Sequence, residues 1–404
     1  MAQAVIVGGG ITGTLTAHAL ASVGWKVTLL EGAHLGAGSS SRTAAGIRQQ
    51  FTTPATVAGM RYAVDFYSHF TERVGGDTRP IVQHGYLFLS GDPQQAAAAK
   101  ARVTLQQGAG LAEVEWLPQG ELQTRFPWLS PDLLGGTFCP TDGFLLPHLV
   151  YMEAAAAAQR HGATIVQGAQ VLGADHAGGR ITSLRTSKGN FGADLFLDCT
   201  NAWTRRTARL LGAADLPVDP LKRYLWFLST GGALPPEIVN RMPLTIGPTG
   251  AYFRPENPEL LLVGKLNAAE PEVEFTMDDQ DVVHPDYDHR GGPDAWSTQA
   301  WMELADFVPA AAEMAGYSAT TCGYYATTPD HNPYLGYDPL VANLIRLVGF
   351  SGHGAMFGPF TAAVGAALAR AGHNIDAVTL RGQTIPLAAF AMGRTPTHHE
   401  DMVI

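Results

Sequence analysis

The sequence of 404 residues has only three cysteines, no apolar run long enough to span a membrane, and no excess of positive charge. Its cysteines, Cys139, Cys199 and Cys322, lack metal-ligand spacing and cannot all pair, so we expect no metal site and a reducing, cytoplasmic setting. A formal net charge of −10 argues against nucleic acid or an anionic membrane as a partner. Because a strand pattern begins at Ala4, we expect no signal peptide in this sequence.

The first 31 residues carry the most specific pattern. An apolar run predicts a buried parallel strand, and a G-x-G-x-x-G motif follows it at once. The expected order is strand, glycine-rich turn, helix, strand and acid, at residues 4–7, Gly8–Gly13, residues 14–23, residues 26–30 and Glu31. This order predicts one half of a dinucleotide-binding fold.

Each position in the motif has a physical role. Gly8 permits the tight turn, Gly10 lets a pyrophosphate approach the backbone, and Gly13 lets the helix pack on the strand. The helix N-terminus attracts phosphate, while Glu31 is placed to bind an adenosine ribose and disfavours NADP. The motif alone does not separate FAD from NAD, and a glycine-rich turn without a ligand is the alternative.

A small polar loop, residues 36–42, follows the acid. In FAD enzymes such a loop commonly wraps the pyrophosphate, so Ser40, Ser41 and Arg42 are candidate contacts, with a solvated loop as the alternative. Arg48 then stands in an uncharged stretch. A guanidinium matches a carboxylate bidentately, so Arg48 is a candidate substrate anchor; a structural arginine bonded to loop carbonyls is the alternative.

The middle of the chain predicts mixed helices and strands. We expect helices at residues 54–74, 93–107, 147–161, 204–211 and 296–305, and strands at residues 84–89, within 164–197, and at 223–229, 251–254, 259–265 and 320–325. Prolines predict an irregular stretch at residues 116–131. The acidic residues 271–293 lack EF-hand spacing and predict a solvated loop. Asn201 is expected in a left-handed conformation.

A second glycine-rich turn, residues 349–354, is expected between a strand at 344–348 and a helix at 356–371. The N-terminus of that helix suits an electron-rich atom such as a flavin carbonyl oxygen. His353 is a candidate base, flavin contact or capping residue. The residues after Ile385 are expected to form a tail.

These motifs occur together in one order: residues 5–31, 39–42, 46–48, 84–89, 197–203, 329–336 and 349–354. In this combination the chain resembles the FAD-dependent D-amino-acid oxidase superfamily, in its sarcosine oxidase and glycine oxidase branch. It also resembles the dimethylglycine-dehydrogenase-like and proline-dehydrogenase-like relatives. The resemblance implies an α/β fold, with a Rossmann-like FAD-binding domain (residues 1–83, 147–215 and 318–404) and an antiparallel-sheet substrate domain (residues 84–146 and 216–317).

The resemblance also implies a site. Arg48 would lie near the substrate carboxylate, and we expect Tyr252, Tyr324 and His353 around the reacting amine. The expected FAD-binding residues are Gly8, Gly10, Ile11, Thr12, Gly13, Glu31, Ser40, Ser41, Arg42, Gly46, Ile47, Val171, Asn201, Trp203, Cys322, Gly352, His353, Gly354, Ala355 and Met356. Cys322 stands where monomeric sarcosine oxidases attach FAD covalently; an ordinary buried cysteine is the alternative.

Two positions depart from the sarcosine oxidase pattern. Met356 replaces a lysine that helps to hold the substrate carboxylate, which leaves room for a larger or less polar substrate. Leu262 aligns loosely with a lysine that promotes reaction with oxygen, and Lys265 follows three residues later.

The function we expect is oxidation of an amino acid or related amine, with N-alkyl amines favoured. A hydride would pass from the carbon alpha to nitrogen to flavin N5, giving an imine, and oxygen would be reduced to peroxide. A dehydrogenase that passes electrons to a carrier, and a non-catalytic flavin- or NAD-binding protein, are the alternatives. We expect a monomer or small homo-oligomer.

Overall fold

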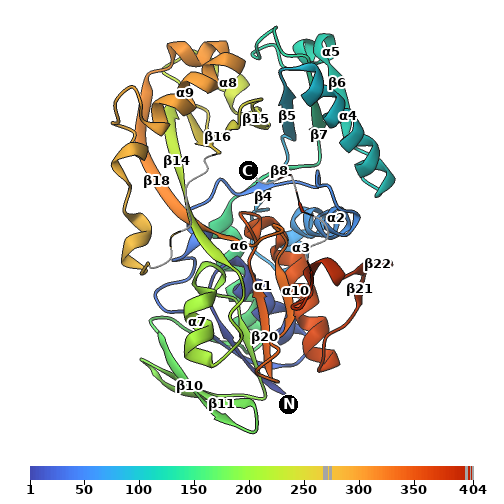
Figure 1. Ribbon diagram of the computed structural model, residues 1–404, viewed down its shortest axis with the longest axis vertical. Coiled ribbons are helices and arrows are strands. Elements are labelled where there is room, and N and C mark those ends of the chain that lie inside the picture. The colour runs from blue at the N-terminus through green and yellow to red at the C-terminus, as the bar shows by residue number, and fades with distance from the viewer. Residues whose placement is uncertain (267–271, 273–274, 396–398, 401, 403–404) are drawn as a thin grey trace.

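The structure, a computed structural model, describes all residues except 267–271, 273–274, 396–398, 401 and 403–404 (Figure 1). Its first sheet has six strands in the order β19-β20-β13-β1-β2-β9. The strands are β1 (Gln3–Val7), β2 (Lys26–Leu30), β9 (Thr164–Val166), β13 (Leu195–Asp198), β19 (Tyr334–Tyr337) and β20 (Leu344–Val348). Neighbours pair in parallel, except that edge strand β19 runs antiparallel to β20.

Both faces of this sheet are buried, as its continuous apolar strands predict. Successive side chains of a strand point to opposite faces, and β1 shows the consequence. Ala4 and Ile6 belong to one core cluster, which includes residues of helices α1, α6 and α10, whereas Val5 and Val7 belong to another, beneath strand β11 and helix α7. The helices are α1 (Ile11–Ser22), α6 (Pro147–Arg160), α7 (Thr204–Leu211) and α10 (Gly354–Ala371); β11 is Arg180–Thr186.

A second sheet of eight strands lies in the upper half of Figure 1, in the order β18-β14-β17-β16-β15-β5-β7-β6. Its strands are β5 (Tyr86–Ser90), β6 (Glu115–Pro118), β7 (Gly135–Cys139), β14 (Asp219–Ser229), β15 (Leu244–Ile246), β16 (Ala251–Asn257), β17 (Leu260–Lys265) and β18 (Gly316–Thr327). All neighbours pair antiparallel except β5 and β15. The expected combination of a Rossmann-like sheet with an antiparallel sheet is confirmed, while the domain boundaries stay a prediction.

The remaining elements connect or cover these sheets. The other helices are α2 (Pro54–Ser68), α3 (Phe70–Arg73), α4 (Pro93–Gly108), α5 (Gln119–Arg125), α8 (Pro236–Val239) and α9 (Trp296–Phe307). The smaller sheets are β3 (Gly46–Ile47) with β8 (Gly143–Leu145) and β4 (Ile81–Val82), then β10 (Val171–Ala177) with β11 and β12 (Gly189–Gly192), and the hairpin of β21 (Ala377–Leu380) with β22 (Gln383–Pro386). Among the described residues, no helix is long and apolar enough to cross a membrane.

Three expectations were wrong in detail. The helix expected through residue 74 ends at Ser68, and α3 begins after His69. Residues 116–131 are not wholly irregular, because β6 and α5 lie there; Pro118 precedes the first turn of α5, where the missing N–H costs nothing. The residues just after Ile385 do not form the expected tail, since Phe390 is fully buried and Arg394 forms an ion pair with Asp330 at 2.7 Å; residues 396–398, 401 and 403–404 lie outside the described residues.

Candidate active site

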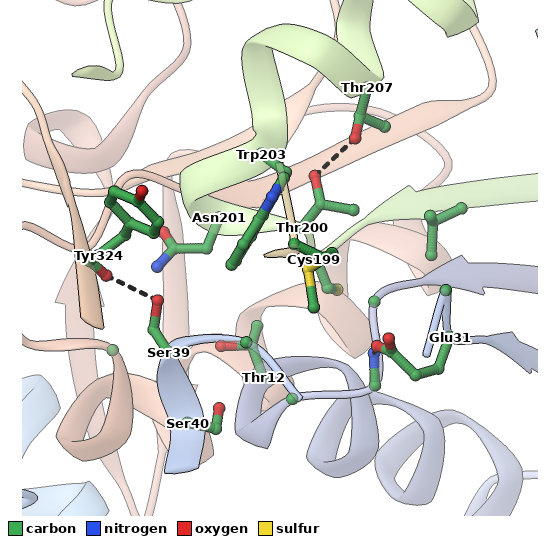
Figure 2. A pocket seen from close by; sticks show the side chains of 18 of the residues that line it. Thr12, Glu31, Ser39, Ser40, Cys199, Thr200, Asn201, Trp203, Thr207 and Tyr324 are labelled. Carbon is green, nitrogen blue, oxygen red and sulfur yellow. Dashed lines mark hydrogen bonds between the residues drawn. The ribbon is translucent and has the colours of Figure 1, made fainter. Parts of the chain in front are cut away.

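A cavity of about 550 Å³ opens at the carboxyl ends of the parallel strands, where ligands bind in folds of this kind. Thirteen of the expected FAD-binding residues line it: Gly8, Gly10, Ile11, Thr12, Glu31, Ser40, Arg42, Val171, Asn201, Trp203, Gly352, Gly354 and Ala355. They come from the turns after β1, β2, β13 and β20 and from β10. Figure 2 shows Glu31 and Tyr324 at opposite ends of the labelled side chains, so the cavity suits an elongated ligand.

The glycines leave no room for side chains. A Cβ on Gly13 would lie 1.8 Å from the carbonyl oxygen of Gly8, so only glycine lets α1 pack this close to β1. A Cβ on Gly10 would lie 2.8 Å from Oγ of Ser40, which itself accepts a hydrogen bond from the N–H of Ile11 at 3.1 Å. The helix begins at Ile11, three residues before the expected start, and therefore its N-terminal turn faces the cavity.

Glu31 is held in place by the backbone. Its Oε2 accepts the N–H of Gly9 at 2.7 Å, and its Oε1 accepts the N–H of Ala33 at 2.8 Å. A carboxylate oxygen has two lone-pair sites, so each oxygen can still accept a further hydrogen bond from a ligand hydroxyl. The expected ribose contact is therefore available in this geometry (Figure 2).

A buried ion network shapes the turn after β13. Arg346 on β20 donates to Asp198 at 2.9 Å and to Asp338 at 2.9 Å, and all three side chains are fully buried. Asp198 also accepts the N–H and the hydroxyl of Thr200 at 2.9 and 2.6 Å, which fixes the turn at the cavity wall. Asn201 adopts φ 47°, as expected for this turn.

The serine loop lies at the cavity with different roles from those expected. Arg42 lines the cavity, but its guanidinium pairs with Asp281 at 2.6 and 2.8 Å and so fastens the loop to the acidic segment. Ser41 does not line the cavity; its hydroxyl donates to the Gly38 carbonyl at 3.4 Å. Ser39 lines the cavity instead and donates to the Tyr324 carbonyl at 2.6 Å.

A smaller cavity of about 40 Å³ adjoins the large one. Thr43, Tyr325, Gly352 and Ala355 line both, and the small cavity is completed by Ala45, Gly46, Arg48, Tyr86, Leu244, Tyr252, His353 and Met356. Three of the four expected catalytic side chains thus meet at one place beside the cofactor-sized cavity. Gly13 and Ile47 line neither cavity and support the site through packing.

Arg48 is fully buried and packs on the ring of Phe51, 4.0 Å from its centroid. It donates hydrogen bonds to the carbonyl oxygens of Gln50 and Met402. Arg48 is therefore bonded to carbonyls here, which was the alternative to a carboxylate anchor. Burial lowers the pKa of its guanidinium, which stays far above neutrality for this residue type.

His353 faces Arg48, with its Nε2 3.2 Å from Nη2 of the arginine. A guanidinium can only donate, so Nε2 is the acceptor in this contact, and the buried Nδ1 has no hydrogen-bond partner among the described residues. Burial, and then the charge of Arg48, hold the pKa of His353 well below its usual value. The imidazole is therefore neutral at physiological pH and cannot act there as a cationic acid.

Tyr324 does not point into the small cavity. Its hydroxyl donates to Glu272 at 2.9 Å, and its ring centroid lies 4.2 Å from that of Phe275. Tyr324 lines the large cavity only, whereas the next residue, Tyr325, points to the opposite face of the strand and lines both cavities. The hydroxyls of Tyr325 and Tyr252 are hydrogen-bonded to each other.

Cys322 lines neither cavity. It shares the strand face of Tyr324, and its buried thiol donates to the carbonyl oxygen of Gln280 at 3.0 Å. Burial raises the pKa of this thiol to about 11, so the reactive thiolate is scarce at neutral pH. Cys322 therefore lies outside both cavities, and a covalent flavin link at this residue stays a prediction.

No lysine occupies the position where sarcosine oxidases carry the lysine that promotes reaction with oxygen, because Leu262 stands there and Lys265 is paired elsewhere. Leu262 is buried in the apolar cluster that includes Tyr252, whereas Lys265 pairs with Glu303 at 2.5 Å. None of the five lysines of the chain, all of them described, lines either cavity.

Several further residues that line the large cavity were not predicted from the sequence. Gln170, Thr200, Arg206 and Thr207 all reach the large cavity, and the hydroxyls of Thr200 and Thr207 are 2.9 Å apart. Thr200 follows the end of a strand at the same sheet edge as Gly8, and this position could have identified it as a cavity residue. Among the described residues, no cluster of potential metal ligands is present.

The family model described as FAD dependent oxidoreductase matches residues 3–368. The chain belongs to this family. It is 28% identical to FAD-dependent oxidoreductase domain-containing protein 1 of Bos taurus, covering 96% of this chain and 84% of that protein. It is 25% identical to the mitochondrial sarcosine dehydrogenase of Homo sapiens, covering 88% of this chain but 38% of that protein. The family resemblance and the FAD cofactor are confirmed.

Solved structures show the same fold. L-proline dehydrogenase from P. horikoshii aligns with a TM-score of 0.80 at 26% identity, covering 92% of this chain and 94% of that one. Glycine oxidase from Geobacillus kaustophilus aligns with a TM-score of 0.78 at 23% identity, covering 98% and 100%. The name of the human relative places that protein in mitochondria, so a cytoplasmic location here stays a prediction.

The residues of the large cavity fit FAD. The N-termini of α1 and α10 both meet it, and neither helix has an acidic residue in its first turn. Partial positive charge at these ends suits a pyrophosphate and an electron-rich ring atom. Trp203 lines the cavity, and its buried Nε1 has no hydrogen-bond acceptor among the described residues, which leaves a donor for a ligand oxygen.

Proposed function

We propose that this chain oxidises the C–N bond of an amino acid whose carboxylate binds Arg48. The observation that carries the proposal is the fully buried guanidinium of Arg48 beside a cavity that joins the cofactor-sized cavity. A buried cation favours an anionic ligand, and the planar guanidinium suits a carboxylate. Met356 supplies no second cation, so one arginine would hold the substrate.

The cofactor would lie along the large cavity. Glu31 would bind the adenosine ribose, the N-terminus of α1 the pyrophosphate, and the turn Gly352–Ala355 the flavin ring. When bound, FAD would supply the acceptor for the hydride that leaves the carbon next to nitrogen. The remaining catalytic work of the chain is to hold the substrate and to exclude water.

The neighbouring groups favour a neutral amine. His353 is uncharged, and the hydroxyls of Tyr252 and Tyr325 are kept protonated because burial raises their pKa values. None of these three groups stabilises an ammonium by opposite charge. The substrate amine would therefore bind neutral, and the rate of flavin reduction should rise with pH through the amine titration.

The cofactor would be held non-covalently. Acid precipitation tests this, because non-covalent FAD passes into the supernatant and covalent FAD stays with the pellet. A yellow pellet carrying flavin on the Cys322 peptide would contradict the non-covalent assignment.

The electron acceptor distinguishes an oxidase, which reduces oxygen, from a dehydrogenase, which reduces a carrier. An oxidase stays the prediction from the sequence. The absence of lysine from both cavities favours the alternative, a dehydrogenase that reduces a carrier. Peroxide formed per substrate consumed in air decides between them: one equivalent supports the oxidase, and almost none, with turnover restored by an artificial acceptor, supports the dehydrogenase.

The central test is anaerobic flavin reduction by an amino acid and by its decarboxylated amine. Arg48→Met should raise the concentration of amino acid needed for half-maximal reduction by about 100-fold, since a buried charge-assisted pair contributes about 3 kcal/mol. It should change the response to the amine little. Arg290→Met, at an exposed arginine paired with Asp288, is the matched control. Equal losses for both ligands, or no reduction by any amine, would overturn the proposal.

A further inference from the structure

Two residues near the end of the sequence, Glu400 and Met402, bond to Thr52 and to Arg48, and Arg48 lines the small cavity. We call Glu400 and Met402 together the C-terminal anchor. The carbonyl oxygen of Met402 accepts a hydrogen bond from Nη2 of Arg48. This is the guanidinium to which the substrate carboxylate is assigned above, so the chain presents its own acceptor at the proposed substrate site.

The anchor is held by specific bonds. The carboxylate of Glu400, which is 1% exposed, accepts the N–H of Thr52 at 3.1 Å and its hydroxyl at 2.9 Å. The same carboxylate accepts the N–H of Met402 at 3.1 Å, which orients the carbonyl toward Arg48. The backbone N–H of Glu400 donates to the Asp330 carbonyl at 3.1 Å, and Nδ1 of His331 lies 3.1 Å from the Glu400 carbonyl oxygen.

The side chain of Met402 fills space as well. It is 9% exposed and belongs to an apolar cluster with Tyr86, Phe88, Phe144, Leu225, Leu244, Ile246, Tyr252 and Leu262. Three of these residues, Tyr86, Leu244 and Tyr252, also line the small cavity. With Met402 seated, that cavity has about 40 Å³, against hundreds of Å³ for typical ligand pockets, so an amino acid does not fit.

We propose that the C-terminal anchor is an internal competitor for the substrate, and that its release opens an apolar pocket for a monocarboxylic amino acid with an apolar side chain. This inference rests on the proposed function, because it uses Arg48 as the carboxylate site. A carboxylate is the stronger acceptor for a guanidinium than a neutral carbonyl, so a substrate can displace Met402. The apparent affinity is then reduced by the fraction of molecules in which the anchor is seated.

The test uses the holoenzyme and a carboxylate that cannot be oxidised at nitrogen, 3-methylbutanoate. Calorimetric titration compares the full chain with a chain that ends at His399, which keeps the Arg394–Asp330 ion pair. We expect the shortened chain to bind 3-methylbutanoate at least tenfold more tightly. Succinate, which carries a second charge, should gain less. Equal affinities of the two chains for 3-methylbutanoate would overturn the inference.

Two point variants keep the test informative if the shortened chain does not fold. Glu400→Ala removes the clamp on Thr52 and Met402 and should tighten 3-methylbutanoate binding several-fold. His399→Ala, at the exposed neighbouring residue, should change the affinity less than twofold. An equal response of both variants, or none from Glu400→Ala, would contradict a specific competitor.

Hydrogen exchange in the full chain gives a readout that is independent of activity. The amide hydrogens of Glu400 and Met402 are bonded, so saturating 3-methylbutanoate should speed their exchange at least fivefold. Slower exchange would show that ligand and anchor bind together. If Arg48→Met leaves 3-methylbutanoate binding unchanged in both chain lengths, the proposed function fails; if it abolishes binding while the shortened chain binds no tighter, only the anchor fails.

Discussion

Asp142 holds the two residues that follow Arg48 and carries a testable pH dependence. It is fully buried, and its carboxylate accepts the N–H and the side-chain amide of Gln49 at 3.0 and 2.9 Å and the amide of Gln50 at 3.2 Å. These two glutamines directly follow Arg48. Burial raises the pKa of Asp142 from an ordinary 3.8 to about 6, despite these donors and the nearby Arg48 charge.

The sign of the effect follows from this direction. A raised pKa means that the folded state binds the proton more tightly than the unfolded state, so lowering the pH stabilises the fold through this group. The difference between the two pKa values corresponds to a stabilisation of about 3 kcal/mol at low pH. About 2 kcal/mol of this stabilisation develops between pH 7 and pH 4. The contribution is thus lost as the pH rises through about 6.

The isosteric substitution Asp142→Asn removes the titration. We expect the free energy of unfolding of the wild type, relative to that of the variant, to increase by about 2 kcal/mol from pH 7 to pH 4. Reversible urea unfolding at several pH values measures this difference, in which the other carboxylates cancel. An infrared band of a protonated carboxyl at pH 5, absent from the variant, reports the same group directly.

Asp288 provides a control of opposite sign. Its hydrogen bonds with Arg290 lower its pKa. The free energy of unfolding of the wild type, relative to that of Asp288→Asn, should therefore decrease as the pH falls. A stability difference for Asp142→Asn that is constant with pH, or that follows the Asp288 direction, would refute the reasoning.

Three further substitutions test the packing and the site. Gly13→Ala places a Cβ 1.8 Å from the Gly8 carbonyl oxygen, so the purified protein should lose FAD and melt at lower temperature; normal flavin content would contradict this. Arg346→Met leaves two buried aspartates without their cation and should destabilise the fold by about 3–5 kcal/mol in urea unfolding. A change under 1 kcal/mol would mean that the network is not structural. Cys322→Ser should keep full, acid-releasable FAD, and colourless protein would argue for a flavin link.

The cofactor half of the site could be predicted because its requirements are local. The motif from Gly8 to Glu31 combines a turn, a close approach and a helix end within one strand–helix–strand unit, and each requirement selects a residue type. The structure places these residues around one cavity as expected. Ser40 and Arg42 of the serine loop line this cavity and Ser41 does not, while the role of Arg42 depends on Asp281, which lies far away in the sequence.

The substrate half could not be resolved to the residue, because it depends on which face each strand presents. On β18, Cys322 and Tyr324 share one face, and Tyr325 lies on the other. The sequence around them is uniformly apolar or aromatic, so its pattern has no period of two to set the face. The pairing of β18 with β14 decides which face each side chain takes, and the local sequence does not specify that pairing.

The proposed mechanism joins two interpretations of Arg48. The sequence allowed either a carboxylate anchor or an arginine bonded to loop carbonyls. Both ligands are oxygen acceptors, and a buried guanidinium without acceptors would be costly, so a site that releases its substrate needs a substitute acceptor. The Met402 carbonyl provides such an acceptor, although Met402 is more than 350 residues away from Arg48 in the sequence. On the proposed mechanism, the two interpretations are successive states of the same guanidinium, and the affinity for substrate reflects the difference between its two acceptors.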